Sequence, residues 1–517
     1  MASIGIGDWI EHASEGIGQV ERITFGGRSL MVRFENRTGL TVIPLFEAVK
    51  VNSDGTRTGQ VPIPVASRKV RTMLPEGKEG ELLALRLVEA LRTGVAPGRW
   101  AHLYSIGRDT ELALVDCDLR QCHDGGAVRV FLGDYGTGKT HMLDLVRERA
   151  LQDNFVVARA VLDETEVSPS HPQRVYRALI DGISYPDCED AEGLYHLFQR
   201  AVELHRLQKS ASSPLQEDYN VKENWPDVDR VWLANLFSRD KSRRHEYLTP
   251  ALLYFERLTS PELLGNPYSD ELIDHLLNYI EGRSVVSNKE LNDALRQFTG
   301  INPGHIFAVR DQKTLAHLYA YILGGIAALS RAAGYTGLVL LLDEAEMAGL
   351  LSSQAQDLAT YLFGYYAASA VGSEGVRFNI DDAPRGGQRV HRAFPPVFRT
   401  PSNIYCVFAM TNEDRGKRLL EKVISQSAFC DLAHIQADDC RKLCRSLVDL
   451  YLMAYPGFSL GGDIEKPMGD MVYRGVTNGK FATPRLILKF IIETLDMSRL
   501  CRSKIVHFVT EFRERIG

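Results

Sequence analysis

Four short segments of the chain are almost continuously apolar, at 127–132, 155–161, 337–342 and 404–410. Runs of this length predict strands that are buried on both faces of a parallel sheet. Residues 80–93 instead carry leucine and valine at helical spacing, which predicts an amphipathic helix. Because strands and helices alternate after this helix, we expect a three-layer α/β sheet.

The stretch between the second and third predicted strands is too long for a simple crossover, and its pattern is mostly helical. We expect a helical insertion over about 180–330, with helices at 194–207, 232–237, 248–258, 270–281 and 315–332. Within this division the α/β core spans 99–425. Beyond Ser425 the pattern predicts only helices, at 437–455, 483–498 and 505–516, and we expect these to form a lid domain over 426–517.

Residues 1–60 contain short alternating strands with glycine turns, which predict a small β-barrel. The segment resembles the SH3/Tudor-like modules of bacterial transcription-coupling factors and helicase tails. Such modules bind polymerase or another protein, and some bind DNA. Acidic residues slightly outnumber basic ones here, so a protein-docking barrel without chemistry is the preferred interpretation. A linker with the amphipathic helix follows over 61–98. The resemblance rests on Gly7, Asp8, His12, Gly16, Gly18 and Val20.

Composition narrows the class of protein. The chain is 44% hydrophobic and 24% charged, as in ordinary globular proteins, and its apolar runs are too short to cross a bilayer. The N-terminal residues lack the basic and apolar regions of a secretory signal. Eight cysteines without a C-x-x-C pair favour reduced thiols in a cytoplasmic protein. A net charge of −6 restricts any nucleic-acid surface to local patches.

Residues 133–140 fit the phosphate-binding pattern G-x-x-x-x-G-K-[ST] at every fixed position, between a predicted strand and a predicted helix. The glycines allow backbone N–H groups to wrap a phosphate, and the helix N-terminus adds partial positive charge. Lys139 would contact the β- and γ-phosphates, and Thr140 would ligate Mg²⁺. For His141 we favour packing over nucleotide contact. The predicted ATP site comprises Gly133, Asp134, Tyr135, Gly136, Thr137, Gly138, Lys139, Thr140 and His141.

Two carboxylates follow the apolar run at 337–342 and would lie at the carboxyl edge of the sheet, where ligands bind in open α/β folds. Asp343 is expected in the Mg²⁺ shell, since Mg²⁺ takes few carboxylates together with phosphate oxygens and waters. Glu344 is placed to orient or deprotonate the attacking water. Glu346 is interpreted as a surface or supporting residue.

Polar residues after the last apolar run complete the predicted catalytic set. Asn412, or Thr411, would position water beside the γ-phosphate without repelling it. The order Thr483, Pro484, Arg485 is typical of a helix start, from which the guanidinium could reach the γ-phosphate. Arg415 and Arg418 are weaker candidates for acting on a neighbouring subunit's nucleotide.

This order of motifs resembles the AAA+ ATPases, in particular the replication initiators and helicase loaders related to the origin-recognition complex. A closer likeness is to the ATP-binding BrxD-like proteins of bacteriophage-exclusion (BREX) defence, over roughly 80–500. It rests on 89–95, 133–141, 333–337 and 343–346. The resemblance implies an ATPase in anti-phage defence that assembles into homo-oligomers on ATP and acts with other defence proteins or DNA. The N-terminal barrel is an addition to that pattern.

A loop at 377–399 is rich in arginine and could contact DNA phosphates or a partner subunit, although a solvated charged loop is the simpler interpretation. Its candidate DNA contacts are Arg385, Arg389 and Arg392. Two other functions remain open beside the ATPase. One is a nucleotide-dependent scaffold or switch with little turnover, which recruits partners through the barrel. The other is a helicase loader without a defence role.

Overall fold

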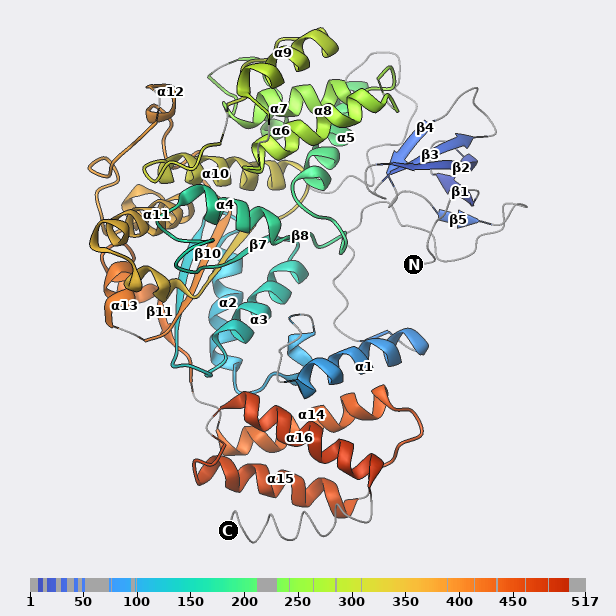
Figure 1. The fold of residues 1–517 in the computed structure, drawn as a ribbon, viewed down its shortest axis with the longest axis vertical. Helices are drawn as coiled ribbons and strands as arrows, with labels where there is room; N and C mark the ends of the chain where they lie inside the picture. Colours follow the sequence, from blue (N-terminus) through green and yellow to red (C-terminus); the bar gives the residue numbers. More distant parts are fainter. Residues whose placement is uncertain are drawn as a thin grey trace. The chain divides into compact units, whose positions relative to one another are not determined.

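The computed structural model describes residues 8–12, 16–24, 29–34, 41–44, 49–51, 74–75, 77–93, 98, 100–211, 230–240, 242–263, 265–283, 286–307, 309–387, 389–412, 414–433, 436–460, 462–481 and 483–501. The chain divides into two compact units (Figure 1). The first comprises residues 1–68, 180–311 and 325–335, and the second comprises residues 69–179, 312–324 and 336–517. Each unit is described separately below.

The first unit contains an N-terminal antiparallel sheet of five strands in the order β4-β3-β2-β1-β5. Its small core consists of alternate residues, among them Ile10, Val20, Leu30 and Val32, as expected when one face of each strand is buried. One of the glycine turns predicted from the sequence is at Gly26-Gly27, which lies outside the described residues. The strands are β1 (Trp9–His12), β2 (Gly16–Thr24), β3 (Ser29–Phe34), β4 (Thr41–Pro44) and β5 (Val49–Val51).

Most of the other described residues of the first unit lie in helices. A helix is present at each of the five predicted positions, and α9 is additional. Its N-terminus is a capping box, in which Ser287 and Glu290 exchange side-chain and backbone hydrogen bonds. The elements are β8 (Ile183–Ser184), α5 (Tyr195–Ala211), α6 (Arg230–Leu236), α7 (Leu248–Leu258), α8 (Pro267–Ile280) and α9 (Asn288–Thr299). α4 (Pro172–Asp181) and α10 (Ala316–Ala332) contribute residues to both units.

The second unit contains a parallel sheet in which β11, β6, β10, β9 and β7 follow one another. Every residue of β9 and β10 is buried, so the apolar runs in the sequence did identify strands covered on both faces. The strands are β6 (Ala127–Leu132), β7 (Val156–Val161), β9 (Leu338–Asp343), β10 (Ile404–Met410) and β11 (Phe429–Asp431). β11 pairs with β6, so the prediction that only helices follow Ser425 was wrong. A three-residue strand is too short to give a periodic signal.

Helices cover both faces of this sheet. Val407 and Ala409 pack into the core shared with α2 (Asp109–Gln121) and α3 (Lys139–Gln152). Phe408 points the opposite way and contacts Phe363 of α11 (Ser353–Val371). Since successive side chains of a strand face opposite sides, α2 and α3 lie on one face and α11 on the other. The remaining short elements are η3 (Ala101–Tyr104), η4 (Ala345–Leu350), η5 (Ser373–Gly375), α12 (Arg389–Arg392), α13 (Asp414–Glu421) and η6 (Gln426–Ala428).

The C-terminal helices form a bundle that includes the predicted amphipathic helix near the start of the chain. α1 (Lys78–Arg92) packs against α14 (Ala437–Ala454) and α16 (Pro484–Leu500), and α15 (Gly462–Thr477) completes the bundle. Arg92 forms a two-pronged ion pair with Asp496 of α16, at 2.6 and 2.8 Å. The apolar face of α1 is therefore buried against helices that lie almost 400 residues later in the sequence. The helix expected at 505–516 lies outside the described residues.

Truncation of Leu91 tests this packing. Leu91 is 1% exposed on the inner face of α1, so Leu91→Ala should destabilise the C-terminal bundle by about 2–5 kcal/mol through lost burial and a cavity. Leu82→Ala is the matched control, since Leu82 lies on the same helix but is 50% exposed. Thermal unfolding followed by circular dichroism would measure both. Equal effects of the two substitutions would contradict the docking of α1.

Candidate functional site

The loop between β6 and α3 has the backbone shape of a phosphate cradle. Gly136 and Gly138 both have left-handed backbone, with φ of +83° and +93°, where a side chain would be strained. The N–H and hydroxyl of Thr137 donate to the carbonyl of Asp134 at 3.2 and 2.9 Å, which closes the loop. Gly138 is the N-cap of α3, so the loop leads directly into a helix N-terminus.

Lys139 is buried and its ammonium points back into this loop. Its Nζ donates to the carbonyls of Gly133 and Asp134 at 3.2 and 3.4 Å. Arg108, at the start of α2, also contacts the loop, although no motif in the sequence indicated this residue. Its guanidinium donates to the carbonyl of Thr137 at 2.5 Å and to Glu111 at 2.9 Å. No sequence pattern marks Arg108, because its role depends on packing between distant segments.

The side chains around the loop differ in exposure. Asp134, Tyr135 and Thr140 are exposed, and Tyr135 is 86% exposed. His141 packs its ring 5.2 Å from that of Tyr104, and burial lowers the pKa of His141 to about 4. His141 therefore makes the packing contact expected for it.

The two predicted acids lie at the carboxyl end of β9. Asp343 is 1% exposed; its Oδ1 accepts the N–H of Glu344 at 3.1 Å, and its Oδ2 accepts from Arg159 at 3.0 Å. Glu344 has a left-handed backbone with φ of +57°, which is uncommon for a residue with a side chain. Burial, then the nearby carboxylates of Glu346 and Asp343, raise the pKa of Glu344 to about 7.

Glu346 lies inside the protein, so the alternative that placed it on the surface was wrong. It is 4% exposed, and among the described residues its buried Oε2 has no hydrogen-bond partner. Gly416 of α13 packs so closely on Glu346 that an added Cβ would be 2.9 Å from the Glu346 Cα. The short 3-10 helix η4 turns Glu346 inward, a turn that strand and helix periodicity do not predict.

β10 lies between the strand that carries the acids and the strand that carries the loop. Met410 is in register with Leu132, and its carbonyl accepts the N–H of Gly133 at 3.2 Å. Thr411 follows directly, with its hydroxyl buried and without a partner among the described residues. Asn412 is exposed, and its Oδ1 accepts from Lys417 at 3.1 Å.

The start of α16 reaches the loop. An added Cβ on Gly136 would lie 2.7 Å from the Cγ2 of Thr483, the residue before the first turn of α16. Arg485 is exposed on that first turn. The fold thus places the loop, Asp343, Glu344, Thr411 and the start of α16 at one edge of the sheet.

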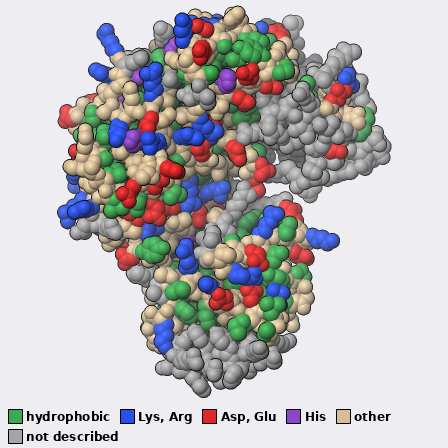
Figure 2. Space-filling view, in the orientation of Figure 1, with side chains coloured by type: hydrophobic (Ala, Val, Ile, Leu, Met, Phe, Trp, Pro, Cys, Tyr) green, Lys and Arg blue, Asp and Glu red, His purple; other side chains and the backbone are tan. Residues whose placement is uncertain are grey.

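The three arginines proposed for DNA differ in setting. Arg385 is partly buried and forms an ion pair with Asp381 at 2.9 Å. Arg389 and Arg392 are exposed on α12, where the Arg392 Nε donates to the carbonyl of Gly387 at 3.1 Å. On the face drawn in Figure 2, basic and acidic side chains are interspersed. Arg389 and Arg392 are therefore the better placed of the three for a phosphate contact.

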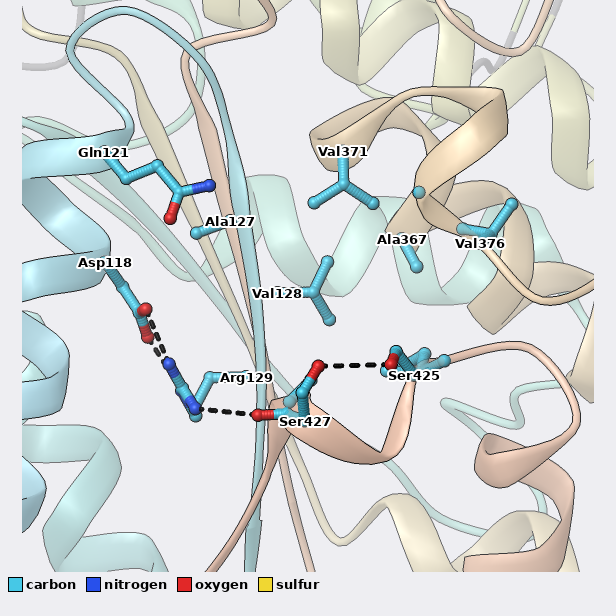
Figure 3. A pocket seen from close by; sticks show the side chains of 13 residues that line it. Asp118, Gln121, Ala127, Val128, Arg129, Ala367, Val371, Val376, Ser425 and Ser427 are labelled. Carbon is cyan, nitrogen blue, oxygen red and sulfur yellow. Dashed lines mark hydrogen bonds and ion pairs between the residues drawn. The ribbon is translucent and has the colours of Figure 1, made fainter.

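A separate open cavity of about 220 Å³ lies at the opposite end of β6 from the loop (Figure 3). Val128, Ala367, Val371 and Val376 give it apolar walls. Beside it, Arg129 forms a two-pronged ion pair with Asp118 at 2.6 and 2.8 Å. None of the predicted ATP-site residues lines this cavity.

The oxygen ligands near the loop suit Mg²⁺, but the protein alone provides few of them. Among the described residues there is no group of three or more His, Cys, Asp or Glu side chains arranged to hold a metal ion. A cation at Thr140 and Asp343 would need phosphate oxygens and waters, as Mg²⁺ prefers.

None of the described helices is long and apolar enough to span a membrane.

Comparison with known families finds one match. Residues 83–227 match the family model described as "BREX system ATP-binding protein BrxC/D". The matched segment includes β6, the glycine loop, α3 and β7, so over these residues the chain is similar to ATP-binding proteins of that phage-defence system. No curated protein matches the chain.

The raised pKa of Glu344 predicts how stability depends on pH. The folded protein keeps a proton on Glu344 up to about pH 7, whereas the unfolded chain releases it near pH 4.5. The stability contributed by Glu344 is therefore complete below pH 4.5 and is lost as the pH rises to about 7. Glu344→Gln cannot ionise, so its melting temperature should exceed that of the wild type at pH 8 and converge with it at pH 5.

Thermal unfolding without nucleotide and with EDTA, across pH 5–8, is the measurement. Glu374→Gln is the control, because Glu374 is an exposed glutamate distant in sequence from the acids. Parallel pH curves for the wild type and Glu344→Gln would contradict the assigned environment of Glu344.

Proposed function

We propose that this protein binds ATP with Mg²⁺ at the β6–α3 loop and hydrolyses it as a P-loop ATPase of the AAA+ class. The observation that carries the proposal is the position of β10 between β6 and β9. This order aligns the ends of three parallel strands, so that the glycine loop, Thr411 and Asn412, and the acids share one edge. A triphosphate on the loop would extend toward the acids.

Phosphate binding is assigned to the loop and its lysine. In the nucleotide-free protein the ammonium of Lys139 hydrogen-bonds loop carbonyls, and it would exchange them for phosphate oxygens. The backbone N–H groups of residues 134–140 and the start of α3 add donors. Thr140 and Asp343 would hold the Mg²⁺, which supplies charge neutralisation at the phosphates when bound.

Hydrolysis is assigned to Glu344, with Asn412 and Arg485 in supporting roles. Glu344 would accept the proton of the attacking water, and a pKa near 7 suits a base that works near neutral pH. Asn412 would leave Lys417 to orient that water. Arg485 would approach the γ-phosphate from the first turn of α16, whose Thr483 already packs on the loop.

Binding of ATP at this site would also affect contacts with other molecules. Tyr135 and Arg485 are exposed near the loop, and Arg415 is exposed at the start of α13. These positions suit contact with a neighbouring copy of the chain. We therefore extend the proposal to ATP-dependent homo-oligomers that act with other BREX-type defence proteins, and with DNA through Arg389 and Arg392.

Paired substitutions test the ATPase proposal. Lys139→Ala should weaken ATP binding by about 10- to 100-fold, because charge-assisted hydrogen bonds to phosphate are lost. Glu344→Gln should keep ATP binding and lose about 100-fold or more in turnover. Lys442→Ala is the matched control, since Lys442 is an exposed lysine on α14. Calorimetry and steady-state phosphate release would measure the two effects.

Size measurements on Glu344→Gln with and without ATP, and with duplex and single-stranded DNA, address assembly. Larger particles only with ATP would support the oligomer. Unchanged ATP affinity in Lys139→Ala would overturn the assigned site. Tight ATP binding with negligible wild-type turnover under all conditions would favour the nucleotide-dependent switch, which the internally paired Lys139, Asn412 and Asp343 also permit.

A further inference from the structure

Arg159 lies between two buried carboxylates at the carboxyl edge of the sheet. It is on β7, next to β9, and faces the same side of the sheet as Val157, which packs in the α3 core. Its Nη1 is 2.5 Å from Oδ1 of Asp144 on α3, and its Nη2 is 3.0 Å from Oδ2 of Asp343 on β9. The guanidinium therefore ties helix α3 to the strand that carries the acids.

Because the two carboxylates are buried, each of them requires a positively charged partner. Asp144 is 2% exposed and Asp343 is 1% exposed, and buried carboxylates are stable only when paired. The Arg159 Nε is also buried and has no partner among the described residues. The contacts with the two carboxylates are therefore made by the two Nη groups. One guanidinium serves two carboxylates, which leaves the cluster of three groups with a net charge of −1.

We propose that Arg159 is a positioning residue that fixes the Asp343 carboxylate relative to α3 before Mg²⁺ and nucleotide arrive. This inference rests on the proposed function, in which Asp343 holds the metal. Asp144 lies on α3, the helix that begins at the phosphate loop with Lys139. Through Asp144, Arg159 connects this helix with the acid proposed to bind the metal. The Oδ1 atom of Asp343 is oriented separately by the N–H of Glu344.

The planar fork of arginine is needed for this role. A guanidinium presents donors in fixed directions and can contact two carboxylates at once, whereas a lysine ammonium is a compact charge on a flexible stem. Lysine at position 159 would keep one positive charge but hold only one acid well. Groups that orient a metal ligand typically contribute 10- to 100-fold to metal affinity.

Removal of the guanidinium should create a requirement for a cation. In Arg159→Met, Asp144 and Asp343 would face each other without a positive charge, and their oxygens are the ligands that Mg²⁺ prefers. MgCl₂ alone, without nucleotide, should then raise the melting temperature of Arg159→Met by about 2 °C or more, through binding to the folded state. The wild type should show no such rise.

Arg129→Met is the matched control. Arg129 is on the same face of the same sheet, on β6, and forms a comparable buried ion pair with Asp118 beside the cavity in Figure 3. Among the described residues it pairs with a single carboxylate, and it lies at the other end of β6 from the phosphate loop. Arg129→Met should also be less stable than the wild type, but its melting temperature should not respond to MgCl₂.

Arg159→Lys provides a second measurement if Arg159→Met fails to fold. ATP binding in EDTA should stay near the wild-type value, while the Mg²⁺ concentration that half-maximally enhances ATP binding should rise about tenfold. The proposal is overturned if Arg159→Lys matches the wild type in this titration. It is equally overturned if a folded Arg159→Met responds to MgCl₂ no more than Arg129→Met. If the wild type binds no ATP, the proposed function fails, whereas the MgCl₂ response still decides the role of Arg159.

Discussion

The structure of the second unit depends on the alignment of three buried parallel strands. The side chains of β6, β10 and β9 are almost all apolar. The backbone N–H and C=O groups of each strand must therefore hydrogen-bond to the neighbouring strands, which pair in one register. Met410 beside Leu132 and Phe408 beside Leu342 fix where each strand ends. The polar residues that follow the strands are therefore brought to the same edge by burial of apolar residues that are distant from them in sequence.

Charged groups at that edge are partly paired within the protein. Lys139 contacts loop carbonyls, and Asp343 contacts Arg159. Burial, and then the nearby carboxylates of Glu346 and Asp343, raise the pKa of Glu344, and Lys139 partly offsets this effect. Buried charges without partners are costly, so a nucleotide-free site of this kind is stable only if its groups pair internally. In the proposed function, phosphate oxygens would replace the loop carbonyls as partners of Lys139, while Arg159 would remain on Asp343.

The bundle around α1 and α16 shows how distant segments support this edge. Helix α1 precedes the sheet in sequence, yet it packs on helices that follow it, through Leu91 and the Arg92–Asp496 ion pair. The start of α16 in turn presses Thr483 on Gly136. The loop and the bundle are therefore in direct contact at this point.

The sequence by itself indicated the four apolar strands of the parallel sheet, most helices and a glycine–lysine loop that leads into a helix, because these follow from local periodicity and residue spacing. It also predicted that Asp343 and Glu344 lie at the carboxyl end of a strand, because they directly follow an apolar run. The tertiary structure alone decided which strands are neighbours, that β11 pairs with β6, and that Glu346 points inward. It also decided that Arg108 and Arg159 reach the loop and the acids. These outcomes depend on contacts between residues far apart in the chain, which leave no periodic pattern in the sequence.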